Sequence, residues 1–211
     1  MARVSSRGRS AGAFARSLDH VLNVPVAAHT LRSAAGSRNT RALSVSVART
    51  PWPVALAFDQ WVETSIEERQ NRPSFNWASI TTFRPDDPII LIHTGRAVQA
   101  LMQFREAYHV PCSHGARGPL ANISFLEVAP WNRSNAERRQ FKGLGQLMLR
   151  FACQRSRQLG HQGRIGLHAL SSAEGFYVRL GFSTPVCLNE YDEMYFELDP
   201  EAAAAFLAEE P

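Results

Sequence analysis

The chain has 211 residues, 45 % of them hydrophobic, and this length provides for one full hydrophobic core plus a tail. No apolar run approaches the roughly 18 residues of a membrane span, so we expect a soluble, cytoplasmic protein with no membrane partner. The pI of 9.3 does not by itself indicate nucleic-acid binding. Residues 1–50 hold eight arginines against Asp19, a charge of +7, whereas the whole chain carries +4. The remaining residues are therefore mildly acidic, and nucleic acid is an expected partner only if the basic segment binds it.

The first 45 residues are rich in Arg, Ser, Ala and Gly and nearly free of acids. This composition predicts a flexible basic arm or an organelle-targeting segment, and both interpretations stay open. Residues 46–211 are expected to form a single domain. The odd count of three cysteines, Cys112, Cys153 and Cys187, argues against a disulfide scaffold and for a reducing compartment, with Cys153 as a core thiol.

The front half of the chain favours strands. Alternating apolar residues predict one strand around Val45 and Val47, and the run 54–58 predicts another. Positions 61–69 have helical spacing, and Trp61 and Trp77 are expected to be packing anchors. Positions 89–93 and 97–104 fit an antiparallel hairpin, although the second run also fits a helix.

A short loop then holds His109, Cys112 and His114 in H-x-x-C-x-H spacing. A zinc site needs a fourth ligand, and the sequence offers no residue for it. The other interpretation is an ordinary polar loop, and no metal is expected.

The stretch with the most chemical content is Gln140-Phe141-Lys142-Gly143-Leu144-Gly145. It lies between a strand predicted over 121–129, ended by Pro130, and an amphipathic helix predicted over 143–159. The first N–H groups of a helix are free to bind an anion, glycine removes the Cβ that would hold the anion off, and Lys142 adds a positive charge. A tight strand-to-helix connection is the other interpretation. The stretch matches neither a phosphate loop nor a dinucleotide fingerprint.

The predicted helix has one apolar stripe and one basic face. The stripe contains Leu144, Leu147, Met148, Phe151 and Ala152, and the outer face contains Arg150, Arg155 and Arg157.

The last quarter of the chain begins with a strand predicted over 164–170. Ser171-Ser172-Ala173-Glu174 reads as a capping box that starts a short helix. Phe176, Tyr177 and Leu180 form the apolar side of that helix, a closing strand is predicted around Phe196, and a surface helix over 201–210.

Two motifs in this order resemble the GNAT superfamily of acyl-CoA-dependent N-acyltransferases. The family's R/Q-x-x-G-x-G/A pyrophosphate loop matches Gln140 to Gly145, and its F-Y-x-x-x-G-F helix matches Phe176 to Phe182. Ala129-Pro130-Trp131-Asn132-Arg133 and Gly166-Leu167-His168 are similar to a bacterial subgroup. The resemblance implies an α/β (α+β) fold with a mixed, mostly antiparallel sheet, splayed in the middle and flanked by helices. The link from Pro130 to Gln140 is longer than the family's usual one.

The resemblance also implies an acetyl-CoA site. Backbone N–H groups of the loop would hold the pyrophosphate, and the backbone at the end of the preceding strand would pair with the pantetheine arm. The implied cofactor-binding residues are Glu127, Val128, Gln140, Lys142, Gly143, Leu144, Gly145 and Gln146.

Three catalytic residues follow from the same resemblance. Tyr177 occupies the position of a general acid for the leaving thiolate, and the alternative is a core aromatic with a satisfied hydroxyl. Glu127 and His168 are the candidates for the base that deprotonates the amine. An exposed carboxylate and a histidine bonded within the sheet are their alternative roles.

The implied activity is transfer of an acetyl group from acetyl-CoA to a primary amine by direct attack. Two other functions remain open: a non-catalytic acyl-CoA sensor or adaptor of the same fold, and an acyltransferase whose basic arm reaches aminoacyl-tRNA. The sequence identifies neither the amine nor the acyl-chain length, and a homodimer is compatible with it.

Overall fold

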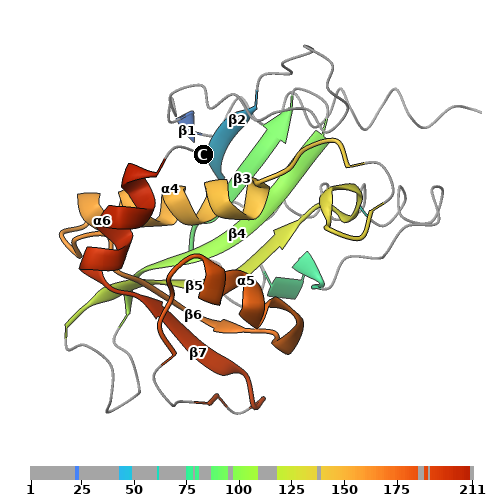
Figure 1. Ribbon diagram of the computed structural model, residues 1–211. Helices are drawn as coiled ribbons and strands as arrows, with labels where there is room; N and C mark the ends of the chain where they lie inside the picture. Colours follow the sequence, from blue (N-terminus) through green and yellow to red (C-terminus); the bar gives the residue numbers. More distant parts are fainter. Residues whose placement is uncertain are drawn as a thin grey trace, which may run out of the picture. The chain divides into compact units, whose positions relative to one another are not determined.

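The computed structural model describes residues 22–23, 43–48, 61, 75–77, 79–80, 87–94, 97–108, 118–136, 139–184, 188–189 and 191–209 (Figure 1). The strands are β1 (Leu22–Asn23), β2 (Ser44–Ala48), β3 (Ile89–Thr94), β4 (Ala97–Tyr108), β5 (Leu120–Val128), β6 (Ile165–Ala169) and β7 (Met194–Leu198). The helices are the 3₁₀ turns η2 (Pro130–Asn132) and η3 (Ser171–Ala173) and the α-helices α4 (Leu144–Gln158), α5 (Glu174–Arg179) and α6 (Pro200–Ala208).

The strands form one seven-stranded sheet in which spatial order equals chain order, from β1 to β7. β1 pairs with β2, β2 with β3, and β6 with β7 in antiparallel fashion, whereas β5 and β6 are parallel. The mixed α/β architecture predicted from the motifs is therefore confirmed.

The chain divides into two compact units. Unit 1 contains Met1–Met102 and Leu126–Gly145, and unit 2 contains Gln103–Phe125 and Gln146–Pro211. β4, β5 and α4 thus contribute residues to both units.

In unit 1 the core is built around buried tryptophans, as predicted. The indole N–H of Trp61 donates to the Val98 carbonyl at 2.9 Å, and the ring stands edge-on to Trp131. Trp77 is also fully buried. A buried indole keeps its N–H paired, which explains why each of these rings lies beside an acceptor.

In unit 2 the edge formed by β6 and β7 has two chemically different faces. Leu167 on β6 lies opposite Phe196 on β7, and His168 lies opposite Tyr195. Side chains alternate along a strand, so Leu167 and Phe196 share an apolar face while His168 and Tyr195 share a polar one. The ring of Tyr177 lies 5.7 Å from that of Phe196, so α5 packs on the apolar face.

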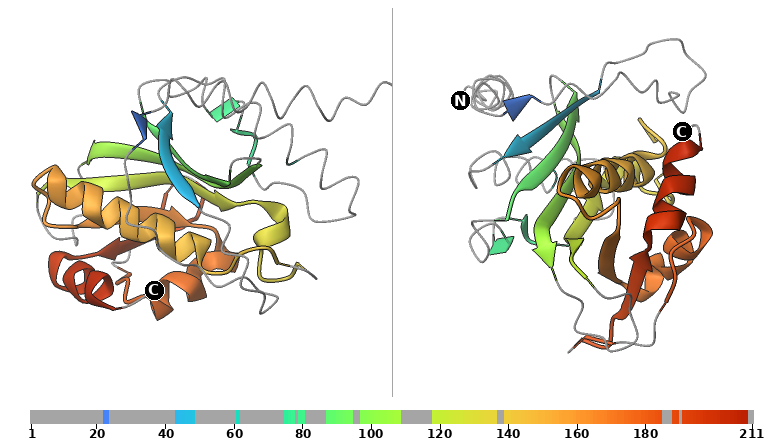
Figure 2. Two further views of the ribbon diagram at one scale, coloured as in Figure 1. Left: turned by 90° about the horizontal axis from the view of Figure 1, so that it is seen from above. Right: turned by 90° about the vertical axis from the view of Figure 1, so that its left-hand side faces the viewer.

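Helix α6 lies beside α4 within unit 2 (Figures 1 and 2). The Arg150 guanidinium of α4 lies 4.8 Å over the Phe206 ring and donates to the Leu207 carbonyl at 3.3 Å. Arg150 is only 5 % exposed, so its predicted place on the outer face is wrong. The predicted surface helix is α6, which packs through its buried Ala203 and Phe206 and leaves Glu201, Ala204 and Ala205 exposed.

The predicted capping box is wrong as well. The chain first forms η3, closed by the Ala173 N–H on the Leu170 carbonyl at 2.7 Å, and α5 starts only at Glu174. Neither helix start has a capping hydrogen bond from a side chain, because the serines are themselves in the 3₁₀ turn. By contrast, α4 follows its predicted bounds closely, and the ambiguous run after Gly95 is strand β4.

Several sequence predictions lie outside the described residues. These are the conformation of residues 1–21 and 24–42, the strand over 54–58, the helix beyond Trp61, and the H-x-x-C-x-H loop with His109, Cys112 and His114. Leu22–Asn23, within the predicted arm, pairs with β2. Within the described part of the chain, no helix is both long and apolar enough to cross a bilayer.

Candidate functional site

The glycine turn lies where the chain enters α4. Gln140, Lys142 and Gly143 are exposed, and Gly143 has a φ of +78°. This left-handed conformation is strained for residues with a Cβ, so glycine is required here. α4 begins at Leu144 and carries no acidic side chain in its first turn. No acidic side chain of that turn therefore competes with a ligand for the free N–H groups of the helix or for the Lys142 ammonium.

Six of the predicted cofactor-binding residues form the turn and the first helical turn after it. Leu144 is buried and anchors the helix, while Gly145 and Gln146 are half-buried. Gln146 is the first residue of α4 that belongs to unit 2, whereas Gln140 to Gly145 belong to unit 1.

Glu127 lies near the end of β5 in unit 1 and is only 5 % exposed. Its carboxylate accepts a hydrogen bond from the Trp77 indole at 2.8 Å and pairs with Arg133. The alternative of an exposed carboxylate is therefore wrong. Burial is tolerated because the guanidinium supplies the opposite charge and the indole a second donor.

The backbone groups change direction along β5. The Ala121 N–H donates to the Arg164 carbonyl, next to β6, at 3.2 Å, whereas the Ala129 N–H donates to the Gln99 carbonyl of β4 at 2.9 Å. In an unbroken strand, backbone groups of residues 121 and 129 would point the same way, so the regular alternation is interrupted between them.

Tyr177 lies in α5 of unit 2 and is 7 % exposed. Its ring is 5.2 Å from Phe176 and 5.4 Å from Phe182, both residues of the second motif. This burial raises the pKa of the Tyr177 phenol to about 12. The phenol is therefore protonated throughout the neutral range.

His168 is half-buried on β6, with its ring 5.3 Å from Tyr195. Burial lowers the pKa of His168, and the negative charge of Glu193 partly offsets this. At neutral pH the imidazole is therefore uncharged and can accept a proton.

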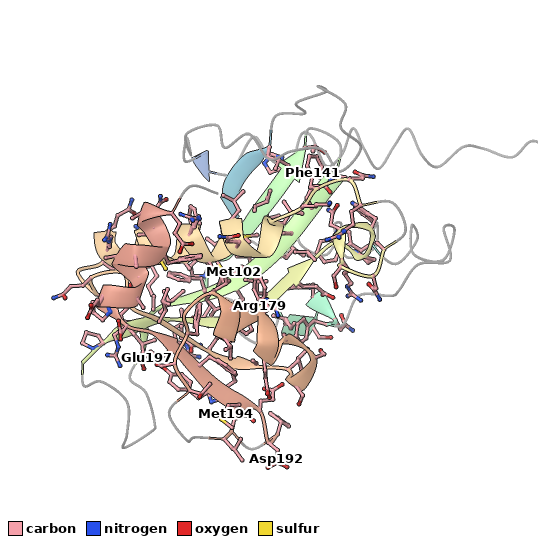
Figure 3. All side chains as sticks on the ribbon, in the orientation of Figure 1. Met102, Phe141, Arg179, Asp192, Met194 and Glu197 are labelled. Carbon is pink, nitrogen blue, oxygen red and sulfur yellow. The ribbon has the colours of Figure 1, made fainter. Side chains whose placement is uncertain are left out.

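Behind Tyr195 lies a buried polar chain that the sequence did not reveal. The Tyr195 hydroxyl donates to Glu197 at 3.0 Å, and Glu197 accepts from Arg164 at 2.6 Å. Arg164 also donates to the Gly118 carbonyl at 2.8 Å. Glu197 is labelled on β7 in Figure 3. Tyr195 and Glu197 alternate with the apolar residues Met194, Phe196 and Leu198, and this alternation is the signal that could have found them in the sequence.

Unit 1 thus holds Glu127, Val128 and the glycine turn, and unit 2 holds His168 and Tyr177. No group of three or more histidine, cysteine or acidic residues suited to a metal ion occurs among the residues that the structure describes.

Comparison with known proteins gives matches in three-dimensional structure only. No protein-family model matches the chain, and no curated protein matches its sequence. A putative N-acetyltransferase from Lactobacillus plantarum matches with a TM-score of 0.50 and 13 % identity, over 74 % of this chain and 96 % of its own. A putative acetyltransferase of the GNAT family from Desulfovibrio desulfuricans matches with a TM-score of 0.49 and 14 % identity, over 75 % and 99 %. The chain has a GNAT-like fold.

A third match is to another acetyltransferase structure. YncA from Salmonella typhimurium, a putative acetyltransferase with its cofactor acetyl-CoA, has a TM-score of 0.45 and 12 % identity, over 75 % of this chain and 94 % of its own. At such identities the likeness extends to the fold and not to individual residues. The GNAT-like fold that the two motifs implied is therefore confirmed, at the level of the fold.

Proposed function

We propose that the chain is an N-acetyltransferase that transfers an acetyl group from acetyl-CoA to a primary amine by direct attack. The observation that carries this proposal is Gly143, held at a left-handed φ immediately before a long helix with no acid in its first turn. Such a turn suits a diphosphate, because N–H groups converge on it and no Cβ obstructs the approach.

The backbone of Glu127 and Val128, where β5 ends, is the proposed partner for the amides of the pantetheine arm. The alternation of backbone directions is interrupted between Ala121 and Ala129, and such an interruption leaves backbone groups that a ligand amide can pair with.

Tyr177 serves as the hydrogen-bond donor to the departing sulfur. With a pKa of about 12, its phenol keeps its proton at every pH at which the enzyme works. Thiolate charge develops as the C–S bond breaks, and a buried donor stabilises such charge more than water-exposed groups do.

His168 is the better candidate for the base. The Glu127 carboxylate is already engaged by Arg133 and by the Trp77 indole, so an amine would have to compete with both. The imidazole of His168 is uncharged and half-buried. It takes the proton that the amine loses as the new amide bond forms, directly or through a water molecule.

Replacing Tyr177 with phenylalanine tests the acid role. Acetyl-CoA turnover is measured as CoA release with a panel of primary amines. We expect kcat to fall by about 100-fold, in the range typical of a lost proton donor, while the KM for acetyl-CoA stays within about threefold. Tyr191→Phe, at a residue that is 75 % exposed, is the matched control and should behave as wild type.

Unchanged kcat in Tyr177→Phe would remove Tyr177 from the mechanism. Binding of acetyl-CoA without turnover of any amine would instead favour the sensor or adaptor function. The aminoacyl-tRNA alternative is tested with a chain that lacks residues 1–20, because Leu22–Asn23 pairs with β2 and should be kept. Loss of activity on charged tRNA alone would support that alternative.

A further inference from the structure

A buried glutamine in β4 anchors the segment that leads to the glycine turn. Gln99 lies in a run of buried residues and is only 1 % exposed. Its side-chain oxygen accepts hydrogen bonds from the Trp131 indole at 2.9 Å and from the Asn132 amide at 2.7 Å. Its backbone carbonyl accepts from Ala129. One residue therefore holds both the end of β5 and the η2 turn that follows.

Asn132 carries this anchoring on to the glycine turn. Asn132 is 6 % exposed, and its side-chain oxygen accepts the backbone N–H of Phe141 at 2.9 Å. Phe141, labelled in Figure 3, is buried and lies two residues before Gly143. The amide of Asn132 is thus used at both ends, since its nitrogen donates to Gln99 and its oxygen accepts from the turn.

These hydrogen bonds restrain the long connection that leads to the glycine turn. The connection from β5, which ends at Val128, to α4, which begins at Leu144, is long, and a longer connection has more conformations to lose when the turn is ordered. A diphosphate site needs its N–H groups held to within about 0.5 Å, which requires support from packed neighbours. Gln99 supplies that support from β4, and Asn132 supplies it from η2.

We infer that Gln99 and Asn132 are positioning residues that set the affinity of the glycine turn for the diphosphate of CoA. The inference rests on the proposed function, since it assigns CoA to this turn. It assigns no contact between either side chain and the ligand. Both act through the backbone at Phe141.

The test compares ligands that differ in the diphosphate. Affinities of CoA, of dephospho-CoA, which keeps the diphosphate, and of 4′-phosphopantetheine, which lacks it, are measured by calorimetry. Asn132→Leu keeps the side-chain size but removes both hydrogen bonds. We expect it to weaken CoA and dephospho-CoA by about tenfold, because the Phe141 N–H loses its acceptor, and to leave 4′-phosphopantetheine unchanged.

Two further variants make the test independent of folding defects. Gln99→Met keeps Asn132 in place but removes its anchor, and the same selective loss is expected at a smaller size. Asp199→Ala removes the cap of α6, where Asp199 accepts the Ala202 N–H at 2.8 Å, and it controls for lost stability alone. It should lower the melting temperature and leave all three affinities unchanged.

Equal weakening of all three ligands, or of none, in both Asn132→Leu and Gln99→Met would overturn the inference. A wild-type chain that binds neither CoA nor dephospho-CoA would instead refute the proposed function. The two failures are therefore separable.

Discussion

At the scale of single residues, burial separates the side chains that are ready for proton transfer from those that are already engaged. His168 and Tyr177 are both shifted toward their uncharged forms by burial, the imidazole by a lowered pKa and the phenol by a raised one. A neutral base and a neutral acid are the pair that amide formation from an amine and a thioester requires.

The pH dependence of kcat/KM should report the lowered pKa of His168. Because the folded pKa lies below 6.5, His168 becomes protonated, and activity is lost, only as the pH falls below that value. Glu193 raises the pKa, so Glu193→Gln should move the half-point of this decline to lower pH. Rate measurements over a pH series on both chains check this.

His161→Gln is the matched control for this profile. His161 contacts the Glu106 carbonyl at 2.8 Å and lies outside the proposed site, so its replacement should leave the decline in place. His168→Gln should abolish the decline along with most of the activity. A decline that survives in residual His168→Gln activity would exclude His168 as the base.

The sequence predicted some of these residues and missed others for a clear reason. Gly143 was indicated by its place between a predicted strand and a predicted helix, and Tyr177 by the resemblance of its motif to that of the GNAT superfamily. Gln99 is paired with Trp131, and Arg164 with Glu197, and a single sequence does not show which distant residues meet. A polar residue inside a buried run, as at Gln99, was the only local signal.

At the scale of elements, the close packing of β6 against β7 depends on Gly166. A Cβ on Gly166 would come within 3.0 and 3.1 Å of ring atoms of Tyr195 and nearer still to its hydroxyl. That hydroxyl donates to Glu197. Gly166 therefore makes room for the tyrosine that connects the His168 side of the sheet to the buried Arg164–Glu197 pair.

Gly166→Ala should destabilise the chain by displacing Tyr195. We expect the free energy of unfolding, measured with urea, to fall by about 1–3 kcal/mol, as is typical of an overpacked core site. In a Tyr195→Phe background the cost should be smaller, because the nearest atom is gone. Equal costs in the two backgrounds would contradict this explanation.

Elements were predicted where the sequence pattern is long and regular. The stripe on α4 and the alternation on β7 define their elements well. The start of α5 was missed because the sequence at Ser171 and Ser172 matches the capping-box pattern, whereas the chain forms a 3₁₀ turn at these residues. Burial of Arg150 was missed because it depends on where α6 packs.

At the scale of the whole molecule, the order of elements from β3 to β7 was predictable, and so was the GNAT-like fold that this order implies. The basic charge is concentrated in the first 50 residues, so the charge of the whole chain says little about the domain. The division of the chain into two units was not predictable, since it depends on contacts between distant segments.

The most direct test of the account is calorimetric titration of acetyl-CoA into wild-type protein, Gly143→Val and Gly160→Val. Gly143 and Gly160 have φ values of +78° and +86°, so valine strains the backbone at both. Gly160 lies beyond the other end of α4, away from the proposed turn. The account predicts that wild type and Gly160→Val bind acetyl-CoA with similar affinity and that Gly143→Val binds at least about tenfold more weakly. No binding by wild type, or equal binding by all three chains, would contradict it.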